Sequence, residues 1–339
     1  MAVKIAINGF GRIGRCVTRA LYDRGVTDVE LVAINDLTDP KTLAHLLKYD
    51  SVHRTFASTV EAGDGLINVG GKPIKVIAEK DPAKLPWKEL GVDIVLECTG
   101  LFTTRESAAK HVEAGAKKVI VSAPAKGDDL TVVIGCNDHL YDATKHHVLS
   151  NGSCTTNCLA PIAKVILDNF GIKRGMMTTV HAYTNDQSLL DVPHRKGDLR
   201  RSRAAAANMV PSSTGAAKAI YAIIPELEGK FEGIAVRVPT TDVSLVDLTV
   251  ETEKPVTVAE LNAAMKKAAS EGPMSNVLDY VDIELVSGDF IGNPASSSFD
   301  ATMTQVLQKT LVKVFSWYDN EWGFSNRMID LAQIVAAKL

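Results

Sequence analysis

The sequence predicts an α/β protein with an N-terminal doubly wound, mainly parallel sheet and a following α+β domain whose sheet is largely antiparallel. Short apolar strands alternate with helical patterns through about residue 150, and a glycine-rich turn, 9–14, directly follows the first strand. Beyond that point longer strands of alternating polarity appear. We therefore predict a first domain at 1–152 and a second at 153–323, with a C-terminal helix, 324–339, that packs on the first.

The elements of the first domain follow from apolar runs and helical periodicity. Val3–Ile7 is predicted to be a buried strand. Apolar residues then recur at helical spacing from Ile13 to Leu21, and Gly25 is the expected stop of that helix. Further elements are predicted as strands at 31–34, 94–96 and 119–121, a helix at 106–112 and a Gly-Gly hairpin at 67–74.

The second domain is predicted to contain longer elements. Successive residues of 243–250 face opposite sides, which predicts a long, half-buried strand. Thr257 and Glu260 match a capping box that starts a helix through about Ser270. Residues 183–206 are rich in charge and lack periodicity, and a loop of this size is usually functional or interfacial. The remaining predictions are strands at 176–180, 234–238 and 311–317 and a helix at 216–223.

Composition limits the class of protein. The chain has 339 residues, 46% hydrophobic and 23% charged, which is enough apolar material for a sizeable core. The net charge of -3 argues against nucleic acid or an anionic membrane as a main partner. Five scattered cysteines favour a reducing compartment over a disulfide framework, and Cys154 and Cys158 lack the second ligand pair of a zinc site. We expect a cytoplasmic protein with no metal, no signal peptide and no membrane span.

The glycine turn has the context of a dinucleotide-binding fingerprint. Gly9, Gly11 and Gly14 follow a strand and open a helix, and Asp36 lies 22 positions after Gly14 at the end of the second strand. This arrangement predicts a Rossmann-type site in which the helix N-terminus binds the pyrophosphate and Asp36 accepts hydrogen bonds from the ribose. No cation follows Asp36 until Lys41, which favours NAD over NADP. The alternative is that the glycines only shape a turn and Asp36 caps the next element.

The candidate nucleophile is Cys154. It lies between an apolar strand, 148–150, and a helical pattern that is apolar from Leu159 onward. A helix N-terminus carries partial positive charge and unpaired N–H donors, and both features favour a thiolate, which is the reactive form of cysteine. The alternative is a cysteine that is merely a small buried hydrophobe.

A base and anion-binding residues are expected after the thiol. His181 ends a predicted strand and is the candidate base, whereas His45 and His111 look like ordinary helix-face residues. Spacing alone leaves open whether His181 meets Cys154. Arg237 lies within an apolar strand, where its charge must face solvent, a partner or an anionic ligand. Hydroxyls and free N–H groups also precede the predicted helix at 216–223.

Over essentially its whole length, the chain resembles the phosphorylating, NAD-dependent glyceraldehyde-3-phosphate dehydrogenases. Residues 6–15 resemble the opening motif of that family, 153–158 its active-site signature and 317–323 its C-terminal motif. The resemblance implies Cys154 as nucleophile and His181 as the base that activates it. It also implies oxidation of D-glyceraldehyde 3-phosphate to 1,3-bisphosphoglycerate through a cysteine thioester, in glycolysis or gluconeogenesis.

The resemblance also assigns binding roles. The inorganic phosphate site would comprise Ser153, Thr155, Thr214 and Gly215, and Thr184 and Arg237 would hold the substrate phosphate. NAD would contact, in addition to the fingerprint glycines, Arg12, Ile13, Asp36, Lys80, Ser122 and Asn320. The loop 183–206 resembles the S-shaped loop of the family, which lines the cofactor site of a neighbouring subunit in a homotetramer.

The sequence departs from the family pattern at a few positions. Gly152 stands where Ala is usual, Val192-Pro193 replaces Leu-Pro, and 194–198 looks longer by about two residues. These departures bear on the approach to the thiol and on the intersubunit loop. Two alternatives stay open: an erythrose-4-phosphate dehydrogenase, whose thioester is hydrolysed, and a non-catalytic NAD-binding interaction protein. The retained phosphate-binding residues and the intact Cys154 and His181 argue against them.

Overall fold

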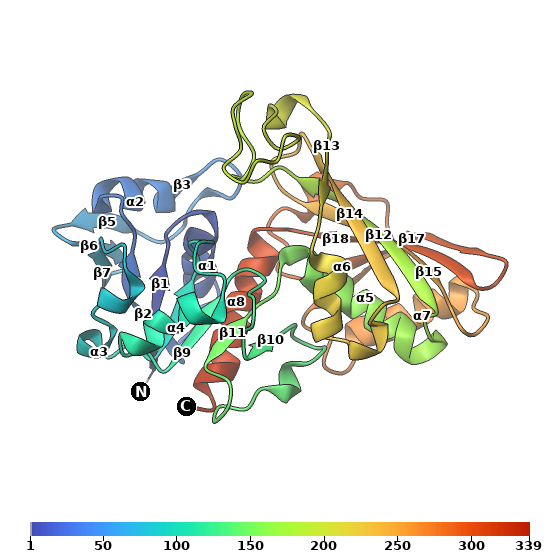
Figure 1. Ribbon diagram of the computed structural model, residues 1–339, viewed down its shortest axis with the longest axis horizontal. Helices are drawn as coiled ribbons and strands as arrows, with labels where there is room; N and C mark the ends of the chain where they lie inside the picture. Colours follow the sequence, from blue (N-terminus) through green and yellow to red (C-terminus); the bar gives the residue numbers. More distant parts are fainter. Residues whose placement is uncertain (1) are drawn as a thin grey trace. The chain divides into compact units, whose positions relative to one another are not determined.

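A computed structural model describes residues 2–339, which form two compact units. The first unit comprises the residues up to 132, 138–153 and 325–339, and the second comprises 133–137 and 154–324. The segment 133–137 lies in the range that the sequence assigns to the first domain, but its Val133 and Cys136 pack in the core of the second unit. Each unit is built around one large sheet (Figure 1).

The first unit contains short strands separated by helices. Its strands are β1 (Val3–Asn8), β2 (Val29–Asn35), β3 (Tyr49–Asp50), β4 (Arg54–Thr55), β5 (Val60–Gly63), β6 (Leu66–Val69), β7 (Lys72–Ile77), β8 (Ile94–Glu97), β9 (Lys118–Val121), β10 (Leu130–Thr131) and β11 (Val148–Ser150). Its helices are α1 (Arg12–Asp23), α2 (Pro40–Lys48), α3 (Trp87–Leu90) and α4 (Arg105–Glu113), with 3-10 turns η1 (Pro82–Lys84) and η2 (Asp138–Leu140). The C-terminal helix α8 (Trp322–Ala336) completes it.

The order of strands confirms the predicted doubly wound sheet. The nine strands run β10-β11-β9-β8-β1-β2-β7-β6-β5, and β1 pairs in parallel with both β2 and β8. The winding therefore reverses at β1, and the carboxyl end of such a strand is where α/β sheets bind ligands. The predicted Gly-Gly hairpin joins β6 to β7, with positive φ values of 57° at Gly70 and 83° at Gly71.

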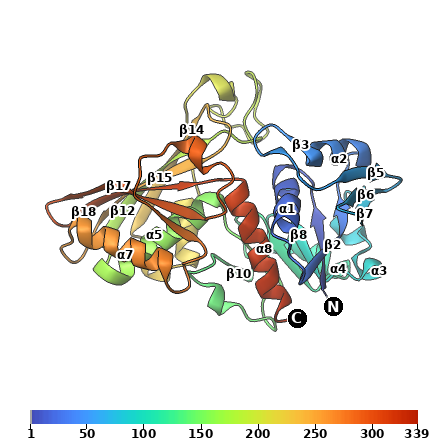
Figure 2. The same ribbon diagram turned by 180° about the vertical axis from the view of Figure 1, so that it is seen from behind.

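Helix α8 belongs to the first unit from residue 325 onward. Arg24 Nη2 donates to Asp330 Oδ1 at 2.6 Å, and Gln333 Nε2 donates to Asp28 Oδ1 at 2.9 Å. Figure 2 shows α8 beside α1. The apolar face of the helix is fully buried at Met328, Leu331, Ala332 and Val335, as its periodicity predicts.

The second unit contains longer strands. They are β12 (Arg174–Ala182), β13 (Val210–Ser213), β14 (Phe231–Val238), β15 (Ser244–Glu251), β16 (Leu278–Val281), β17 (Ser297–Leu307) and β18 (Leu311–Tyr318). The helices are α5 (Cys154–Phe170), α6 (Ala216–Ala219) and α7 (Val258–Ser270), with 3-10 turns η3 (Ala205–Ala207), η4 (Ile220–Ala222), η5 (Pro225–Leu227) and η6 (Ser287–Phe290).

The sheet of this unit is mostly antiparallel, as predicted. Its order is β13-β14-β12-β15-β18-β17-β16, and only the pairs β12–β14 and β16–β17 are parallel among the described strands. Helices α5 and α7 pack against this sheet, and both contact β17 (Figure 2). Strand β15 alternates as expected, with Ser244, Val246, Leu248 and Val250 all buried. The capping box is confirmed: Glu260 N donates to Thr257 Oγ1 at 3.2 Å, and Thr257 N donates to Glu260 Oε2 at 2.8 Å.

The helix predicted over 216–223 is wrong in its second half. Only the first half of this range, α6, is α-helical, and it continues directly as the 3-10 turn η4. The N–H groups of Ile223 and Ile224 both donate to the carbonyl of Ile220, at 3.0 and 2.7 Å. Pro225 follows, and a proline disfavours helical backbone at the residue before it, so the helix cannot continue.

Within residues 2–339, no helix combines the length and the apolar character needed to cross a membrane.

Two neighbouring leucines of α2 test how the first unit is packed. Leu47 has 0% of its surface exposed and Leu46 has 40%. We expect Leu47→Ala to lower the free energy of unfolding by about 2–5 kcal/mol, because it leaves a cavity in the core. Leu46→Ala should lower it by less than about 1 kcal/mol. Urea unfolding of the two variants measures the difference, and equal losses would contradict the packing of this helix.

Candidate active site

The glycine turn after β1 is packed tightly at Gly9 and Gly14 and is open at Gly11. Gly9 has a φ of +91°, which favours glycine, and a Cβ there would lie 2.6 Å from the Thr99 nitrogen. A Cβ on Gly14 would overlap the Gly9 carbonyl oxygen, so α1 packs directly on the turn. Nothing lies within 4 Å of a Cβ built on Gly11, which leaves that side of the turn open.

A cavity of about 510 Å³ lies beside this turn, within the first unit. Its lining includes Gly9, Gly11, Asp36 and Lys80 among the predicted cofactor residues. The other lining residues are Asn8, Asn35, Leu37, Glu79, Cys98, Thr99, Leu101 and Phe102. This mixture of apolar walls and a few polar groups, and this size, are typical of a small-molecule site.

Asp36 ties the glycine turn to the end of β2. Its Oδ2 accepts from the backbone N–H of Phe10 at 2.8 Å, and its Oδ1 accepts from that of Thr38 at 3.0 Å. The carboxylate therefore has a structural task in addition to the ribose contact that the sequence predicts.

The other predicted cofactor residues have partners within their own units. Arg12 forms an ion pair with Asp50, and Ile13 is half-buried in α1. Ser122 follows β9, and its N–H donates to the carbonyl of Glu97 at 2.9 Å. Asn320 is buried in the second unit, where its Oδ1 accepts from the Ser244 hydroxyl at 2.7 Å.

Strand register brings the candidate catalytic residues of the second unit together. His181 in β12 is paired directly with Arg237 in the parallel neighbour β14. Cys154 is the first residue of α5, as the sequence predicts, and its Sγ lies 3.5 Å from Nε2 of His181. A thiol and an imidazole at this distance can exchange a proton.

The far nitrogen of His181 has two competing neighbours. Nδ1 lies 2.7 Å from the carbonyl oxygen of Ala182 and 2.9 Å from Nη1 of Arg237. The same Nη1 donates to Ala182 O and to Thr184 Oγ1, each at 3.2 Å. Because a guanidinium can only donate, Nδ1 must be unprotonated when it bonds Arg237 and protonated when it donates to Ala182 O. The two states place the ring proton on opposite nitrogens.

Burial and charge set the acidity of this pair. Burial raises the pKa of the Cys154 thiol, and the Arg237 charge and the Thr155 amide oppose that rise. Burial, reinforced by Arg237, lowers the pKa of His181 to about 3. The helix N-terminus expected to favour a thiolate is therefore offset by burial, and the ring of His181 is neutral near neutral pH.

A tyrosine that sequence reasoning did not single out connects the base and the thiol helix. The Tyr318 hydroxyl lies 2.9 Å from Thr155 Oγ1 and 2.8 Å from Thr179 Oγ1. Its ring meets that of His181 edge-on, with centroids 5.9 Å apart. The available signal was its place in a strand, β18, whose alternate residues are buried, because a buried tyrosine hydroxyl needs partners.

The predicted phosphate residues lie at the strand end beside His181 and at the starts of α5 and α6. Thr184 and Arg237 are in contact, as described above. Thr214 Oγ1 accepts from Ala216 N at 3.2 Å, and Gly215 is the N-cap of α6. Ser153 immediately precedes α5, next to Gly152, whose φ of +64° favours glycine.

Arg201 links these two groups. It pairs with Asp186 at 2.9 Å, whose other oxygen accepts from the Thr184 hydroxyl. Its Nη2 donates to the carbonyl of Ser213 at 3.4 Å, directly before Thr214.

The segment 183–206 is a loop held by its own hydrogen bonds. Val192 N donates to Ser202 O at 3.0 Å, and Arg203 pairs with Asp191 at 2.6 Å. The lengthened part turns at Gly197, whose φ is +72°. Val192 and several leucines of this loop are exposed, namely Leu189, Leu190 and Leu199.

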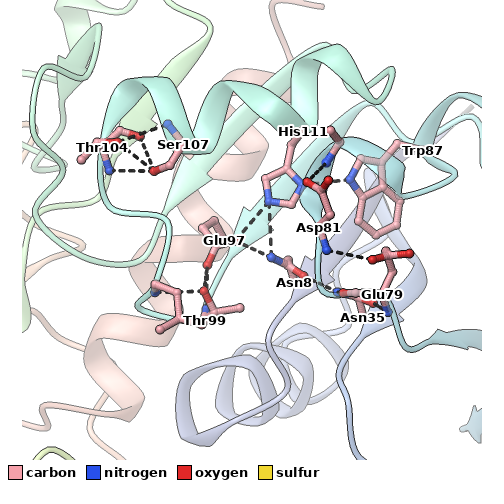
Figure 3. Close-up of polar contacts among 12 residues, drawn as sticks. Asn8, Asn35, Glu79, Asp81, Trp87, Glu97, Thr99, Thr104, Ser107 and His111 are labelled. Atoms are coloured by element: carbon pink, nitrogen blue, oxygen red, sulfur yellow. Dashed lines mark hydrogen bonds and ion pairs between the residues drawn. The ribbon is translucent and has the colours of Figure 1, made fainter. Parts of the chain in front are cut away.

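The interpretation of His111 as an ordinary helix-face residue is wrong. His111 has 0% of its surface exposed and bonds both Trp87 and Glu97 (Figure 3). Glu97, Asn8 and Asn35, which complete this network, were not predicted as functional. Sequence spacing gave no signal, because Asn8 and Glu97 are 89 positions apart and meet only through the sheet.

Comparison with known proteins identifies relatives of the whole chain. The family model described as "Glyceraldehyde 3-phosphate dehydrogenase, NAD binding domain" matches residues 3–105, and that described as "Glyceraldehyde 3-phosphate dehydrogenase, C-terminal domain" matches 153–320. Glyceraldehyde-3-phosphate dehydrogenase 1 of Bacillus cereus is 60% identical over 99% of both chains. The Geobacillus stearothermophilus protein of that name is 59% identical, over 100% of this chain and 99% of its own length, and that of Streptomyces coelicolor is 54% identical over 100% of both.

The two cysteines of α5 should differ in reactivity. Cys158 is fully buried, and burial raises its pKa to about 12, whereas Cys154 is partly accessible and faces an imidazole. We expect iodoacetamide to label Cys154 at least about tenfold faster. Peptide mapping after timed labelling measures both rates, and equal labelling would exclude Cys154 as the reactive thiol.

His181→Asn should move the labelling of Cys154 to higher pH. Burial already raises the pKa of this thiol, and the variant removes the only imidazole that the structure places beside it among residues 2–339. The thiolate fraction at a given pH should therefore fall, and the rate–pH curve should shift upward. His45→Asn, in the exposed part of α2, is the control. An unshifted curve in His181→Asn would reduce His181 to a structural residue.

Proposed function

Because this chain belongs to the glyceraldehyde-3-phosphate dehydrogenase family, we propose that it oxidises D-glyceraldehyde 3-phosphate to 1,3-bisphosphoglycerate with NAD and inorganic phosphate. The observation that carries the proposal is the group formed by Cys154, His181 and Arg237, with 3.5 Å between sulfur and imidazole. A nucleophile, its base and a cation for an anionic substrate are thus adjacent.

The first unit fits NAD. At Gly9 the backbone of Thr99 occupies the space that a side chain would need, whereas the open side of Gly11 borders the cavity. Asp36 lines that cavity with a carboxylate that can accept from ribose hydroxyls. We infer further contacts from Arg12, Ile13, Gly14, Lys80, Ser122 and Asn320. NAD, when bound, supplies the hydride acceptor for the oxidation.

The chain supplies the nucleophile and the proton acceptor. His181 Nε2 takes the thiol proton, the Cys154 sulfur adds to the aldehyde carbon, and the proton then passes to the new oxygen to give a hemithioacetal. His181 Nε2 takes that proton as the carbon loses its hydride, which leaves a thioester on Cys154. General base help of this kind contributes about 10²–10⁴-fold to the rate.

The substrate phosphate also prepares the base. Arg237 and Thr184 are proposed to hold this phosphate, and its charge would draw the guanidinium from Nδ1 of His181. Nδ1 can then carry a proton and donate it to Ala182 O, which leaves Nε2 free as the acceptor beside Cys154. The positive charge of Arg237 also helps to lower the pKa of His181, so this pKa should rise when the guanidinium moves away.

The second half of the reaction returns the thiol. Inorganic phosphate attacks the thioester carbon, the carbon–sulfur bond breaks, and the products are an acyl phosphate and the Cys154 thiolate. We assign the attacking phosphate to Ser153, Thr155, Thr214 and Gly215. Hydroxyls and backbone N–H groups at the starts of α5 and α6 support this assignment.

We also propose a cytoplasmic homotetramer. The five cysteines are free thiols, which suits a reducing compartment. The exposed leucines of the loop 183–206 are the kind of apolar surface that a neighbouring subunit covers. Sedimentation measures the oligomeric state.

Neither alternative has an observation in its favour. The relatives reported above are all named glyceraldehyde-3-phosphate dehydrogenases, and the Cys154–His181 contact is that of an enzyme rather than of a binding protein.

Phosphate dependence is the test of the proposed reaction. Without phosphate, glyceraldehyde 3-phosphate should give about one NADH per active site and then stall, because the thioester persists. Phosphate or arsenate should restore turnover. Thr214→Ala should raise the phosphate KM more than it slows the first burst, and Arg237→Ala should weaken aldehyde binding. Rapid steady turnover without phosphate, faster with erythrose 4-phosphate, would favour the hydrolytic relative.

Preference for NAD over NADP tests the role of Asp36. The wild type should prefer NAD, because a 2′-phosphate would meet this carboxylate. Since Asp36 also accepts hydrogen bonds from Phe10 and Thr38, Asp36→Gly should lower kcat/KM for NAD. It should also bring the kcat/KM values for NAD and NADP closer together. Asp36→Asn, which removes the charge and keeps an acceptor, separates the two effects. Comparable kcat/KM values for both cofactors in the wild type would refute the assignment.

A further inference from the structure

Outside the thiol site, three fully buried side chains of the first unit are joined in series by hydrogen bonds (Figure 3). Trp87 and His111 have 0% of their surface exposed and Glu97 has 1%. The indole Nε1 of Trp87 donates to His111 Nδ1 at 3.0 Å, and His111 Nε2 lies 3.1 Å from Glu97 Oε2. An indole nitrogen can only donate, so Nδ1 carries no proton. The ring is therefore the neutral Nε2–H tautomer and donates to Glu97.

The carboxylate of Glu97 receives every donor around it. Oε2 accepts from His111 Nε2 and from Asn8 Nδ2, the latter at 2.5 Å. Oε1 accepts from the Thr99 N–H at 2.8 Å and from the Thr99 hydroxyl. Three of these groups can only donate in this arrangement, and the Thr99 hydroxyl donates as well. The two oxygens of Glu97 therefore act as acceptors at the centre of the network.

The side-chain amides of Asn8 and Asn35 extend this hydrogen-bond network toward β2. Asn35 Nδ2 donates to Asn8 Oδ1 at 2.6 Å and to the carbonyl of Glu79 at 2.9 Å. Asn35 Oδ1 accepts from the N–H of Glu79 at 2.9 Å. Since backbone groups cannot exchange donor for acceptor, the orientation of Asn35 is fixed at one end and that of Asn8 by Glu97 at the other.

These groups border the cofactor cavity. Asn8, Asn35, Glu79 and Thr99 all line it. The ring of His111 packs edge-on against that of Phe102, another lining residue, with ring centroids 6.3 Å apart.

Glu97 also controls the turn that contacts the fingerprint. The two bonds from Thr99 to Glu97 hold this turn directly against Gly9, where even a Cβ would not fit. Thr99 Oγ1 in turn accepts from the N–H of Leu101 at 3.0 Å. A shift of the carboxylate would therefore move both the polar floor of the cavity and the glycine turn.

We propose that Glu97 is a positioning residue for the dinucleotide, and that His111 and Trp87 keep its carboxylate oriented by fixing one tautomer of the ring. This inference rests on the proposed binding of NAD in this cavity. A purely structural role is the competing interpretation, because a fully hydrogen-bonded buried network also makes the surrounding core rigid. The two interpretations differ in which kinetic constant responds.

Glu97→Gln is the first variant. Its amide oxygen can serve Thr99, but its amide nitrogen then faces two other donors, Asn8 Nδ2 and His111 Nε2. Asn8 cannot turn over to relieve this, because Asn35 already presents a donor to its other side. We expect the Kd and KM for NAD to rise about tenfold or more. The kcat at saturating NAD, the KM for glyceraldehyde 3-phosphate and the labelling rate of Cys154 should stay within about twofold.

Glu113→Gln, at the exposed end of α4, is the matched control and should change none of these constants. An unchanged Kd for NAD in Glu97→Gln would overturn the proposal, as would a fall of kcat and of labelling equal to the rise of KM, because a general loosening acts on every step. If the wild type itself failed to bind NAD, the proposed function would fail instead, and the two failures are thereby distinguished.

A spectroscopic test does not depend on the stability of the Glu97 variant. In ¹⁵N NMR of the wild type, the ring proton of His111 should be on Nε2, and Nδ1 should show the shift of an unprotonated nitrogen that accepts a hydrogen bond. Trp87→Phe keeps most of the ring bulk and removes the N–H that Nδ1 accepts, so the ring is no longer held in one tautomer. In this variant the Nδ1–H tautomer should become detectable, and NAD should bind several-fold more weakly. An Nδ1–H tautomer of His111 in the wild type, or unchanged NAD binding in Trp87→Phe, would refute the proposed network.

Discussion

A single nitrogen atom, Nδ1 of His181, determines what the catalytic unit can do. Parallel register sets His181 beside Arg237, and the start of α5 sets Cys154 on the other side of the ring. An imidazole with one proton can offer a base to the thiol only if that proton is on Nδ1, and a guanidinium at Nδ1 excludes it. The register of the sheet therefore places the Arg237 cation where it prevents His181 from acting as a base toward the thiol. An anionic substrate that binds Arg237 would remove this conflict.

The two buried histidines show how the same ring is used in opposite ways. In both, Nδ1 faces a group that can only donate: the indole of Trp87 for His111 and the guanidinium of Arg237 for His181. The indole is fully buried, so the tautomer of His111 is permanent and its neighbour Glu97 has a constant partner. The guanidinium ends a flexible side chain that is only half-buried, so the tautomer of His181 can change. Fixed tautomers suit a scaffold for the cofactor, and exchangeable ones suit proton transfer.

Local pattern predicted most of the fold and the centre of each site. Gly9, Asp36 and Cys154 stand in short motifs whose geometry is set by neighbours in sequence, so a strand, a turn and a helix suffice to place them. The network of Glu97 and the role of Tyr318 could not be predicted in this way, because their partners come from strands far apart in the chain. His111 was predicted to be an ordinary helix-face residue for the same reason, because helical spacing identifies a face but not the polar groups opposite it. The helix at 216–223 failed because a proline beyond its end outweighed its propensity.

Acidity of the nucleophile is the property that the sequence motif describes least well. A cysteine at a helix start suggests a depressed pKa, yet burial of Cys154 acts in the opposite direction, and Arg237 and the Thr155 amide only oppose it. Arg237 meanwhile also disfavours the charged form of His181, so it assists the thiolate and hinders the imidazolium at once. A permanent ion pair of thiolate and imidazolium is therefore not what this unit is built to hold. The arrangement instead favours a neutral pair of thiol and imidazole, and under the proposed assignment of Arg237 to the substrate phosphate, entry of that anion frees the imidazole to accept a proton.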